Sequence, residues 1–221
     1  MNTKKYGPFL VALLIIAPFV YGALIFPHLP NKIPTHFNIE GKADAWGGPS
    51  SIFIGPGIMG AVSVFVYVLM SNLKSFDPKK YDEANDTLYS NFAVLTVAFL
   101  SMLSLIIIYS STHADQINVG KLILPLVGLS FAGLGWYMPK FKQNYFVGFK
   151  LPWTLENVDN WNETHKVASK YWIYGGLFQA AISLVLPMKF GLIGFMLTTA
   201  VMVIVPAVFS YRLFKNGNII K

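Results

Sequence analysis

Six long stretches without charged residues fill most of this chain and constrain its fold more than any other feature. Each holds at least 18 residues, and a helix needs about 20 mostly apolar residues, with about 17 as a minimum, to cross a membrane. The remaining segments are too short for a separate soluble domain. We therefore predict an all-α membrane protein with six transmembrane helices in one polytopic domain, residues 1–221. The predicted spans are residues 6–31, 45–73, 87–114, 122–139, 171–188 and 190–211.

The charged residues predict how the chain is oriented in the membrane. Only 12% of residues are charged, about half the fraction typical of soluble domains. On alternating sides of the six spans, 13 Lys and Arg residues share the side of the N-terminus and 4 lie opposite. Basic residues are enriched on the cytoplasmic side of membrane proteins, so we predict that both termini are cytoplasmic. The net charge of +7 then reflects orientation, and we expect no direct binding to nucleic acid.

The interiors of the spans carry no Asp, Glu, Lys or Arg. Ion-coupled transporters keep ionisable groups at this depth, so the sequence argues against active transport. Pro18, Pro56, Pro125 and Pro206 fall inside spans, where each removes a helical hydrogen bond and introduces a kink. We expect these kinks to shape the helix bundle.

Small residues and one amide in the spans predict close helix packing. Gly128 with Ala132, and Gly176 with Ala180, have the spacing that lets two helices approach closely. Gln179 is the most polar side chain near the middle of a span, and we expect it to make an interhelical hydrogen bond.

The first loop predicted to lie outside the cell has the pattern of a short strand and a turn. Residues 33–39 alternate apolar and polar side chains, residues 40–44 read as a polar turn, and Trp46 returns the chain to the membrane interface. One interpretation is an external contact surface for a ligand, and the other is a lid over the helix ends. The contact residues would be His36, Asn38, Asp44 and Trp46. The histidines on this side lack a metal-ligand spacing, and we expect neither a metal site nor a cofactor.

The loop between the fourth and fifth spans, within residues 140–170, is predicted to be cytoplasmic. Gly148 permits a turn and Pro152 ends an extended segment. Lys150 and Trp153 are placed to anchor the loop to anionic lipid headgroups.

A helix is expected to begin after this loop, capped by Asn157 or by Asn160. Four residues recur on one of its faces, which predicts a helix that runs along the membrane interface and merges into the fifth span. They are Trp161, His165, Ala168 and Trp172. We interpret His165 as a packing residue at the interface rather than as a proton carrier.

The residues of this loop resemble the signature of the SdpI family of bacterial membrane proteins. The resemblance is carried by Tyr137-Met138-Pro139-Lys140, Asn144, Gly148, Pro152-Trp153-Thr154-Leu155, Trp161, Thr164-His165 and Gly175. A second stretch resembles the small domain of unknown function that often precedes this signature. It comprises Pro34-Thr35-His36-Phe37-Asn38, Gly41, Asp44 and Trp46-Gly47.

The resemblance implies a protein of the bacterial cell membrane that gives immunity to a secreted, membrane-active peptide toxin. It also implies signal transduction, in which a cytoplasmic transcriptional repressor is held at the membrane. The toxin would meet the outer loop within residues 1–73, and the repressor would meet the cytoplasmic loop of the SdpI-like region, residues 122–221. The cytoplasmic signature residues are Asn144, Gly148, Lys150, Pro152, Trp153, Thr154, Leu155, Trp161, Thr164 and His165.

Two other classes of function stay open on the sequence. A passive channel, or a protein that handles lipids or other amphiphiles, would also use an uncharged bundle with small-residue contacts. An intramembrane enzyme is disfavoured, because the chain contains neither His-Glu-x-x-His nor Gly-x-Ser-x-Gly. It also contains no cysteine, which removes thiolate nucleophiles and disulfides.

Overall fold

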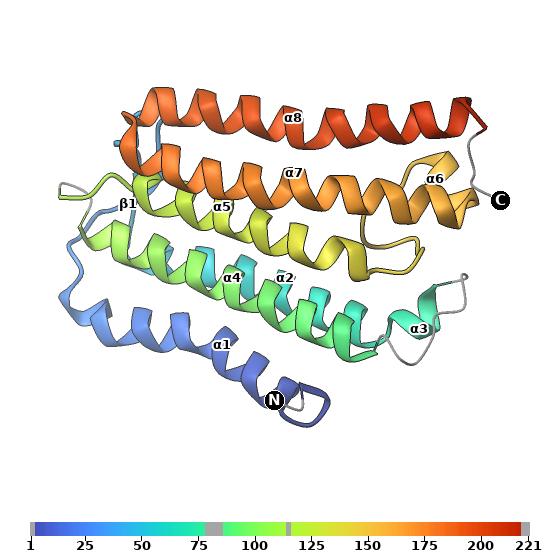
Figure 1. Ribbon diagram of the computed structural model, residues 1–221. Coiled ribbons are helices and arrows are strands. Elements are labelled where there is room, and N and C mark those ends of the chain that lie inside the picture. Colours follow the sequence, from blue (N-terminus) through green and yellow to red (C-terminus); the bar gives the residue numbers. More distant parts are fainter. Residues whose placement is uncertain (1–2, 78–85, 114–115, 218–221) are drawn as a thin grey trace. The chain divides into compact units, whose positions relative to one another are not determined.

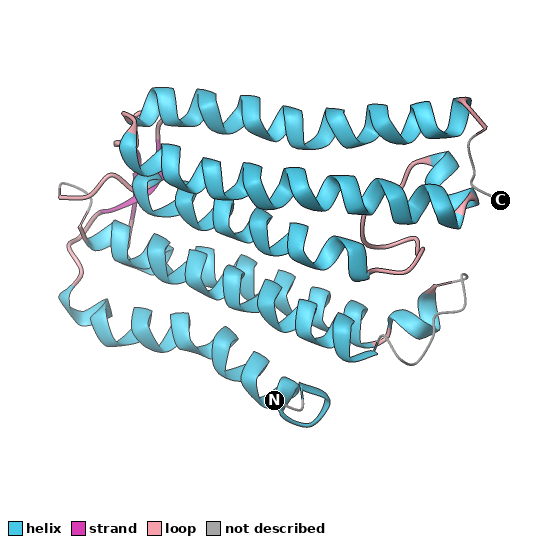
Figure 2. Cartoon of the chain, viewed as in Figure 1, coloured by secondary structure: helices cyan, strands magenta, loops and turns pink. Residues whose placement is uncertain are grey.

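The computed structural model describes residues 3–77, 86–113 and 116–217, which are mostly helical (Figures 1 and 2). The long helices are α1 Thr3–Ile25, α2 Ile54–Ser71, α4 Asp86–Thr112, α5 Gly120–Tyr137, α7 Val158–Val185 and α8 Met188–Lys215. The short elements are η1 Phe26–His28, β1 Ile33–Phe37, β2 Ala43–Gly47, η2 Pro49–Phe53, α3 Leu73–Phe76, η4 Met138–Lys140 and α6 Pro152–Glu156.

Within the described residues, five segments are long and apolar enough to cross a membrane, so the prediction of a helical membrane protein is confirmed. These segments are Tyr6–His28, Pro49–Ser71, Thr87–Thr112, Gly120–Lys140 and Met188–Lys215. The second begins at residue 49 rather than 45 because residues 43–47 form a strand. Of the predicted third span, residue 114 lies outside the described residues.

The fifth predicted span, residues 171–188, falls largely in α7, which is not among these five segments. Its apolar part is shortened at both ends. The N-terminal turns carry polar side chains, and the helix ends at Val185 because Leu186 precedes Pro187 and adopts an extended conformation. Six crossings therefore remain a prediction.

The chain forms two compact units. The first comprises residues 1–72 and 86–123. Here α4 packs against both α1 and α2, and its buried face is a stripe with alternating steps of four and three residues, the spacing of a heptad seam. The stripe consists of Ser90, Val94, Val97, Ser101, Ser104, Ile108 and Ser111.

A proline and a serine meet in the interior of the first unit. Pro18 has no N–H to donate to the carbonyl of Leu14, one turn earlier in α1. The hydroxyl of Ser101 in α4 donates to that carbonyl instead, at 2.6 Å. A polar group that the proline would otherwise leave unpaired in the helix bundle is thereby satisfied.

The first unit also contains a two-stranded antiparallel sheet, in which Ile33 pairs with Gly47 and Phe37 pairs with Ala43. The first strand covers residues 33–37 of the predicted 33–39, whereas the second strand was not predicted. The turn is tighter than expected because the Asn38 side chain accepts the backbone N–H groups of Glu40 (2.9 Å) and Lys42 (3.1 Å). Gly41 completes the turn with φ of 76°. Asp44, expected in the turn, lies in β2.

The second unit comprises residues 73–85 and 124–221, and α7 and α8 lie side by side in it. Close helix contact at the predicted small residues is confirmed, and it joins α5 to α7, because a Cβ on Gly128 would lie 2.7 Å from the backbone nitrogen of Ala180. The interhelical bond of Gln179 is confirmed as well. Its amide donates to the carbonyl of Phe195 (2.9 Å) and to the hydroxyl of Thr199 (2.6 Å) in α8.

Candidate functional site

The second unit holds a folded segment between η4 and α7, residues 141–157, which we call the signature loop. Asn144 organises its first half and is 1% exposed. Its side-chain oxygen accepts the backbone N–H groups of Phe146 (2.8 Å) and Val147 (2.7 Å), and its nitrogen donates to the carbonyl of Lys142 (2.8 Å). An asparagine side chain can replace several backbone partners in this way because it is both donor and acceptor. Asn144, a predicted signature residue, therefore holds the loop, and its part in binding a partner stays a prediction.

Gly148 and His165 fit together at the centre of the loop. Gly148 has φ of 115°, a conformation that other residues rarely adopt, and a Cβ at this position would overlap Nε2 of His165. That nitrogen accepts the backbone N–H of Phe149 at 3.0 Å. A glycine is therefore required for the loop to reach the imidazole.

His165 is 1% exposed, and its imidazole is neutral because Nε2 accepts a hydrogen bond from Phe149. Its Nδ1 donates to the carbonyl of Trp161 at 2.7 Å, which fixes the tautomer, since Nε2 is then the acceptor. Burial lowers the pKa of His165 to about 4, and the hydrogen bond to Trp161 opposes part of that shift. His165 is thus a buried packing and hydrogen-bonding residue, and not a residue of the membrane interface.

Thr154 organises the second half of the loop and is fully buried. Its hydroxyl accepts the N–H of Leu151 at 2.9 Å and lies 2.7 Å from the carbonyl of Phe149, to which it can donate. Gln143 reaches across from the first half and donates to the carbonyl of Thr154 at 2.6 Å. The two halves of the loop are joined by these bonds.

Trp161 connects the loop to the start of α7. It is fully buried, donates its indole N–H to the carbonyl of Phe141 at 2.8 Å, and stacks on His165 with ring centres 4.0 Å apart. The expectation that this face of the helix rests on the membrane interface is wrong for Trp161, His165 and Ala168, because all three are buried within the protein. Asn157 caps α7 by accepting the N–H of Asn160 at 2.8 Å, so the alternative cap at Asn160 is wrong.

A polar network ties the loop to α8. The Trp153 indole donates to the hydroxyl of Ser210 (2.8 Å), and Ser210 donates to the side-chain oxygen of Asn160 (2.7 Å). Thr164 donates to the same oxygen (3.0 Å). Trp153 also stacks on Phe214, with ring centres 5.8 Å apart. Its predicted role as a headgroup anchor is wrong for the indole N–H, which is bonded inside the protein.

The outer surface of the loop consists of other side chains. Tyr145 is 44% exposed, and Val158, the first residue of α7 directly after the loop, is 54% exposed. Lys150 and Pro152 are exposed too, and the Lys150 ammonium donates to the carbonyl of Phe146 at 3.2 Å. Any partner of this loop therefore meets these residues rather than the tryptophans.

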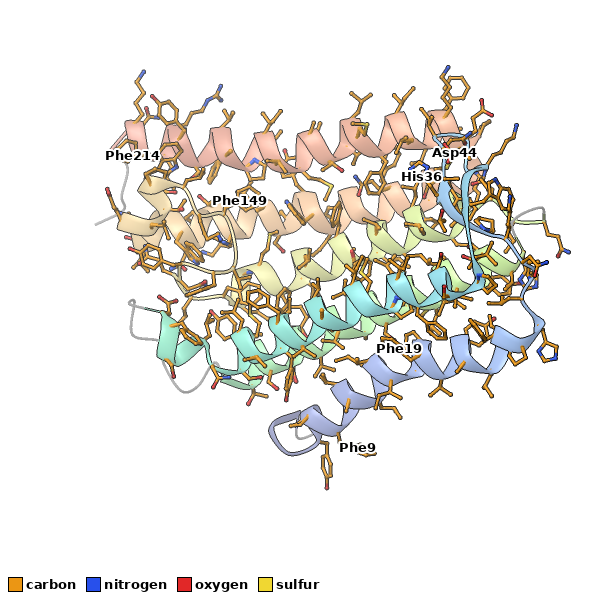
Figure 3. All side chains as sticks on the ribbon, turned by 180° about the vertical axis from the view of Figure 1, so that it is seen from behind. Phe9, Phe19, His36, Asp44, Phe149 and Phe214 are labelled. Atoms are coloured by element: carbon orange, nitrogen blue, oxygen red, sulfur yellow. The ribbon has the colours of Figure 1, made fainter. Side chains whose placement is uncertain are left out.

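The hairpin of the first unit places two predicted residues together. His36 in β1 donates its Nδ1 hydrogen to Asp44 in β2 at 2.5 Å, and both side chains are exposed (Figure 3). Trp46 is 54% exposed and Ile39, beside the turn, is 56% exposed. Asn38 instead holds the turn, as its two backbone bonds show.

Sequence reasoning missed the residue that fixes this hairpin to α5. The Asn118 side chain donates to the carbonyl of Glu40 (2.8 Å) and accepts the N–H of Gly120 (3.1 Å). It missed Ser210 and Gln143 as well. Their signal in the sequence is weak, since single polar residues near span ends are ordinary. In the part of the chain that the structure describes, no group of three or more His, Asp or Glu side chains comes together to hold a metal ion.

Fold and site together define a multi-pass helical protein of the cell membrane with a folded loop held between two of its helices. Residues 140–211 match the SdpI/YfhL protein family, and residues 13–60 match a domain of unknown function, DUF1648. The chain is 24% identical over 206 residues to the immunity protein SdpI of Bacillus subtilis (strain 168), an alignment that covers 93% of this chain and 95% of that protein. No solved structure gives a significant match. The predicted resemblance to the SdpI family is confirmed.

Proposed function

We propose that this chain is a membrane immunity protein that protects its cell from a secreted, membrane-active peptide toxin. The observation that carries the proposal is the similarity to an immunity protein along nearly the whole of both chains. The region matched to the SdpI family begins at Lys140 and ends at Tyr211. It therefore contains the complete network from Asn144 to Ser210.

The proposal includes a six-span topology in which α7 also crosses the membrane and both termini are cytoplasmic. The asymmetry of Lys and Arg supports this orientation. The hairpin then lies outside the cell and the signature loop inside. A toxin that arrives from outside meets the hairpin first.

The toxin contact is assigned to the exposed groups of the hairpin. His36 and Asp44 offer a charge-assisted pair, and Trp46 and Ile39 offer apolar surface beside it. A peptide that is both polar and membrane-active needs contacts of both kinds. Asn38 contributes indirectly, by holding the turn.

The second arm of the proposal is a cytoplasmic repressor held by the signature loop. Its contact surface is Tyr145, Lys150, Pro152 and Val158, which are exposed. Trp153, Thr154 and Trp161 support this surface from below. We assign no catalytic step to the protein, since the sequence offers no nucleophile or metal motif of a known kind.

The test is survival of cells under the toxin. A strain that lacks this protein is exposed to spent medium from its parent strain, and the intact chain is expected to restore growth. Asp44→Ala and Trp46→Ala should weaken protection while the protein accumulates normally, whereas Lys189→Ala, an exposed lysine at the start of α8, should not. Survival of the deletion strain without the chain would refute the immunity function.

An amphiphile-handling protein is the second candidate, and one feature favours it. An open apolar groove of about 320 Å³ on the first unit is lined by Tyr21, Leu105, Ile106 and Tyr109. Narrowing it with Leu105→Trp should leave survival unchanged if the hairpin receives the toxin. If the groove handles an amphiphile, this change should abolish survival under the toxin.

A further inference from the structure

The second unit has an exposed face formed jointly by α5 and α7 (Figure 1). A Cβ on Gly128 would lie 2.7 Å from the carbonyl oxygen of Gly176, and a Cβ on Gly135 would lie 2.9 Å from the carbonyl oxygen of Ser169. The contacts follow opposite orders in the two helices, so α5 and α7 are antiparallel. In an antiparallel pair, the residues that follow such contact residues turn to the same side of the pair.

The residues that follow these four contacts are all exposed. Leu129 in α5 is 53% exposed and Leu177 in α7 is 48% exposed, whereas Trp136 is 62% exposed and Lys170 is exposed as well. Lys140 lies on the same side, since its ammonium is 4.7 Å from the centre of the Trp136 ring. The face is therefore apolar at one end and aromatic and cationic at the other.

The two lysines of this face have no anionic partner. Lys140 contacts only the rings of Trp136 and Tyr137, and Lys170 forms no ion pair with any residue that the structure describes. Lys166, one turn before Lys170, differs because its ammonium lies 2.6 Å from the carboxylate of Glu163. Unpaired cations at one end of an apolar face attract an anion that also carries apolar groups.

The apolar end of the face has a gap of suitable length for a lipid chain. Gly133 lies between Leu129 and Trp136 on the exposed side of α5, and a Cβ on Gly133 would meet nothing within 4 Å. From Leu129 to Lys140 the helix rises by about 16 Å. One leaflet contributes about 15 Å of hydrocarbon, half of the full thickness of about 30 Å.

We propose that this face binds one anionic phospholipid. The phosphate lies between the ammonium groups of Lys140 and Lys170, and an acyl chain lies along Leu129 and fills the gap at Gly133. The Trp136 ring lies between them, at the level of the membrane interface where tryptophan is enriched. A zwitterionic lipid carries its own cation and gains less from the two lysines. Only the identity of the leaflet, the cytoplasmic one, rests on the topology in the proposed function.

Fluorescence quenching by brominated lipids tests this site in the purified protein, without a toxin. The protein is placed in phosphatidylcholine vesicles that contain a rising fraction of phosphatidylglycerol with brominated acyl chains. The signal of Trp136 is obtained as the difference from Trp136→Phe. Its quenching should be half complete at a several-fold lower fraction of brominated phosphatidylglycerol than of brominated phosphatidylcholine. Equal curves for the two lipids would overturn the proposal.

Variants assign the preference to particular groups. Lys140→Gln should raise the half-quenching fraction of phosphatidylglycerol about fivefold, the contribution of one lysine near an anionic surface. Lys189→Gln removes the same charge at the other end of the unit and should leave the curve unchanged. Gly133→Leu keeps both lysines but fills the gap, and it should raise the fraction several-fold.

Three results would contradict the lipid site. An equal shift in Lys189→Gln and Lys140→Gln would show attraction to surface charge alone. Loss of the preference in inorganic phosphate, at an ionic strength matched with sodium chloride, would show a site for the free anion. An unchanged curve in Gly133→Leu would show that no acyl chain occupies the gap.

Discussion

Phe149 donates its backbone N–H to Nε2 of His165 at 3.0 Å, so a neutral imidazole buried in α7 holds the centre of the signature loop. The other ring nitrogen is occupied by the carbonyl of Trp161. Protonation of Nε2 would turn the acceptor into a donor facing another donor. The loop conformation and the charge state of His165 are therefore linked.

Gly148→Ala should open the signature loop. Alanine at φ of 115° is strained by about 1–3 kcal/mol, and its methyl group would displace the imidazole. Amide hydrogen exchange across residues 141–157 should accelerate. Gly133→Ala in α5 is the control, because a Cβ there meets nothing within 4 Å, and exchange in the loop should not change.

The stability of the loop should depend on pH through His165. Burial lowers the pKa of His165 to about 4, against 6.5 for the unperturbed side chain. Between these values the unfolded state binds the proton and the folded state does not, so stability is complete above pH 6.5 and is lost as the pH falls toward 4. The loss amounts to about 3 kcal/mol at the acidic limit. Thermal melts followed by tryptophan fluorescence measure it.

His165→Gln separates this titration from other acid effects. Glutamine keeps an acceptor and a donor but does not titrate in this range, so the pH dependence between 6.5 and 4 should flatten. An equally steep profile in the variant would assign the acid sensitivity to other groups.

The apolar helices were predicted well because the membrane imposes one requirement, a long uncharged stretch. Such a stretch is visible directly in the sequence. Helix α7 was harder to predict from the sequence. Its N-terminal turns contain Asn160, Thr164 and His165, whose polarity resembles that of a solvated helix, yet these residues are 3% exposed or less. Their partners lie far along the chain or in backbone groups, and sequence periodicity does not show where such partners are.

The structure gives several of the predicted signature residues a part in holding the loop, while their binding of a cytoplasmic partner stays a prediction. Gly148 is needed for a positive φ, and Asn144 is needed for hydrogen bonds within its own turn. Both requirements are local, so they can be anticipated from the sequence. The role of Trp153 depends on a partner far along the chain, the hydroxyl of Ser210 in α8. From the sequence alone, an indole near the end of a predicted span was therefore interpreted as a lipid anchor.

Single cysteines should establish the orientation, since the natural chain contains none. Ser75→Cys and Tyr145→Cys should be shielded from a membrane-impermeant thiol reagent in intact cells, and Lys42→Cys and Lys189→Cys should react. All four positions are exposed. Labelling on the opposite sides would reverse the assignment of the hairpin and the signature loop.

In both units, a backbone carbonyl that a proline leaves without its helical donor accepts a hydrogen bond from a neighbouring helix. In the second unit, Pro206 has no N–H for the carbonyl of Met202, and the Trp172 indole in α7 donates to it at 2.9 Å. In the first unit Ser101 does the same for Leu14, opposite Pro18. Each pair links a kink in one helix to a donor on another.

This relationship predicts an energetic coupling between Trp172 and Pro206. Trp172→Phe keeps an aromatic ring but leaves the Met202 carbonyl unpaired, and it should cost about 0.5–2 kcal/mol of stability. In a Pro206→Ala background the new alanine N–H can bond to that carbonyl, so the same change should cost clearly less. Thermal or denaturant unfolding of the four proteins of the double-mutant cycle measures the difference. Additive losses would show that the indole contributes through ring packing against Phe131 and Phe149 and not through the carbonyl that the proline leaves free.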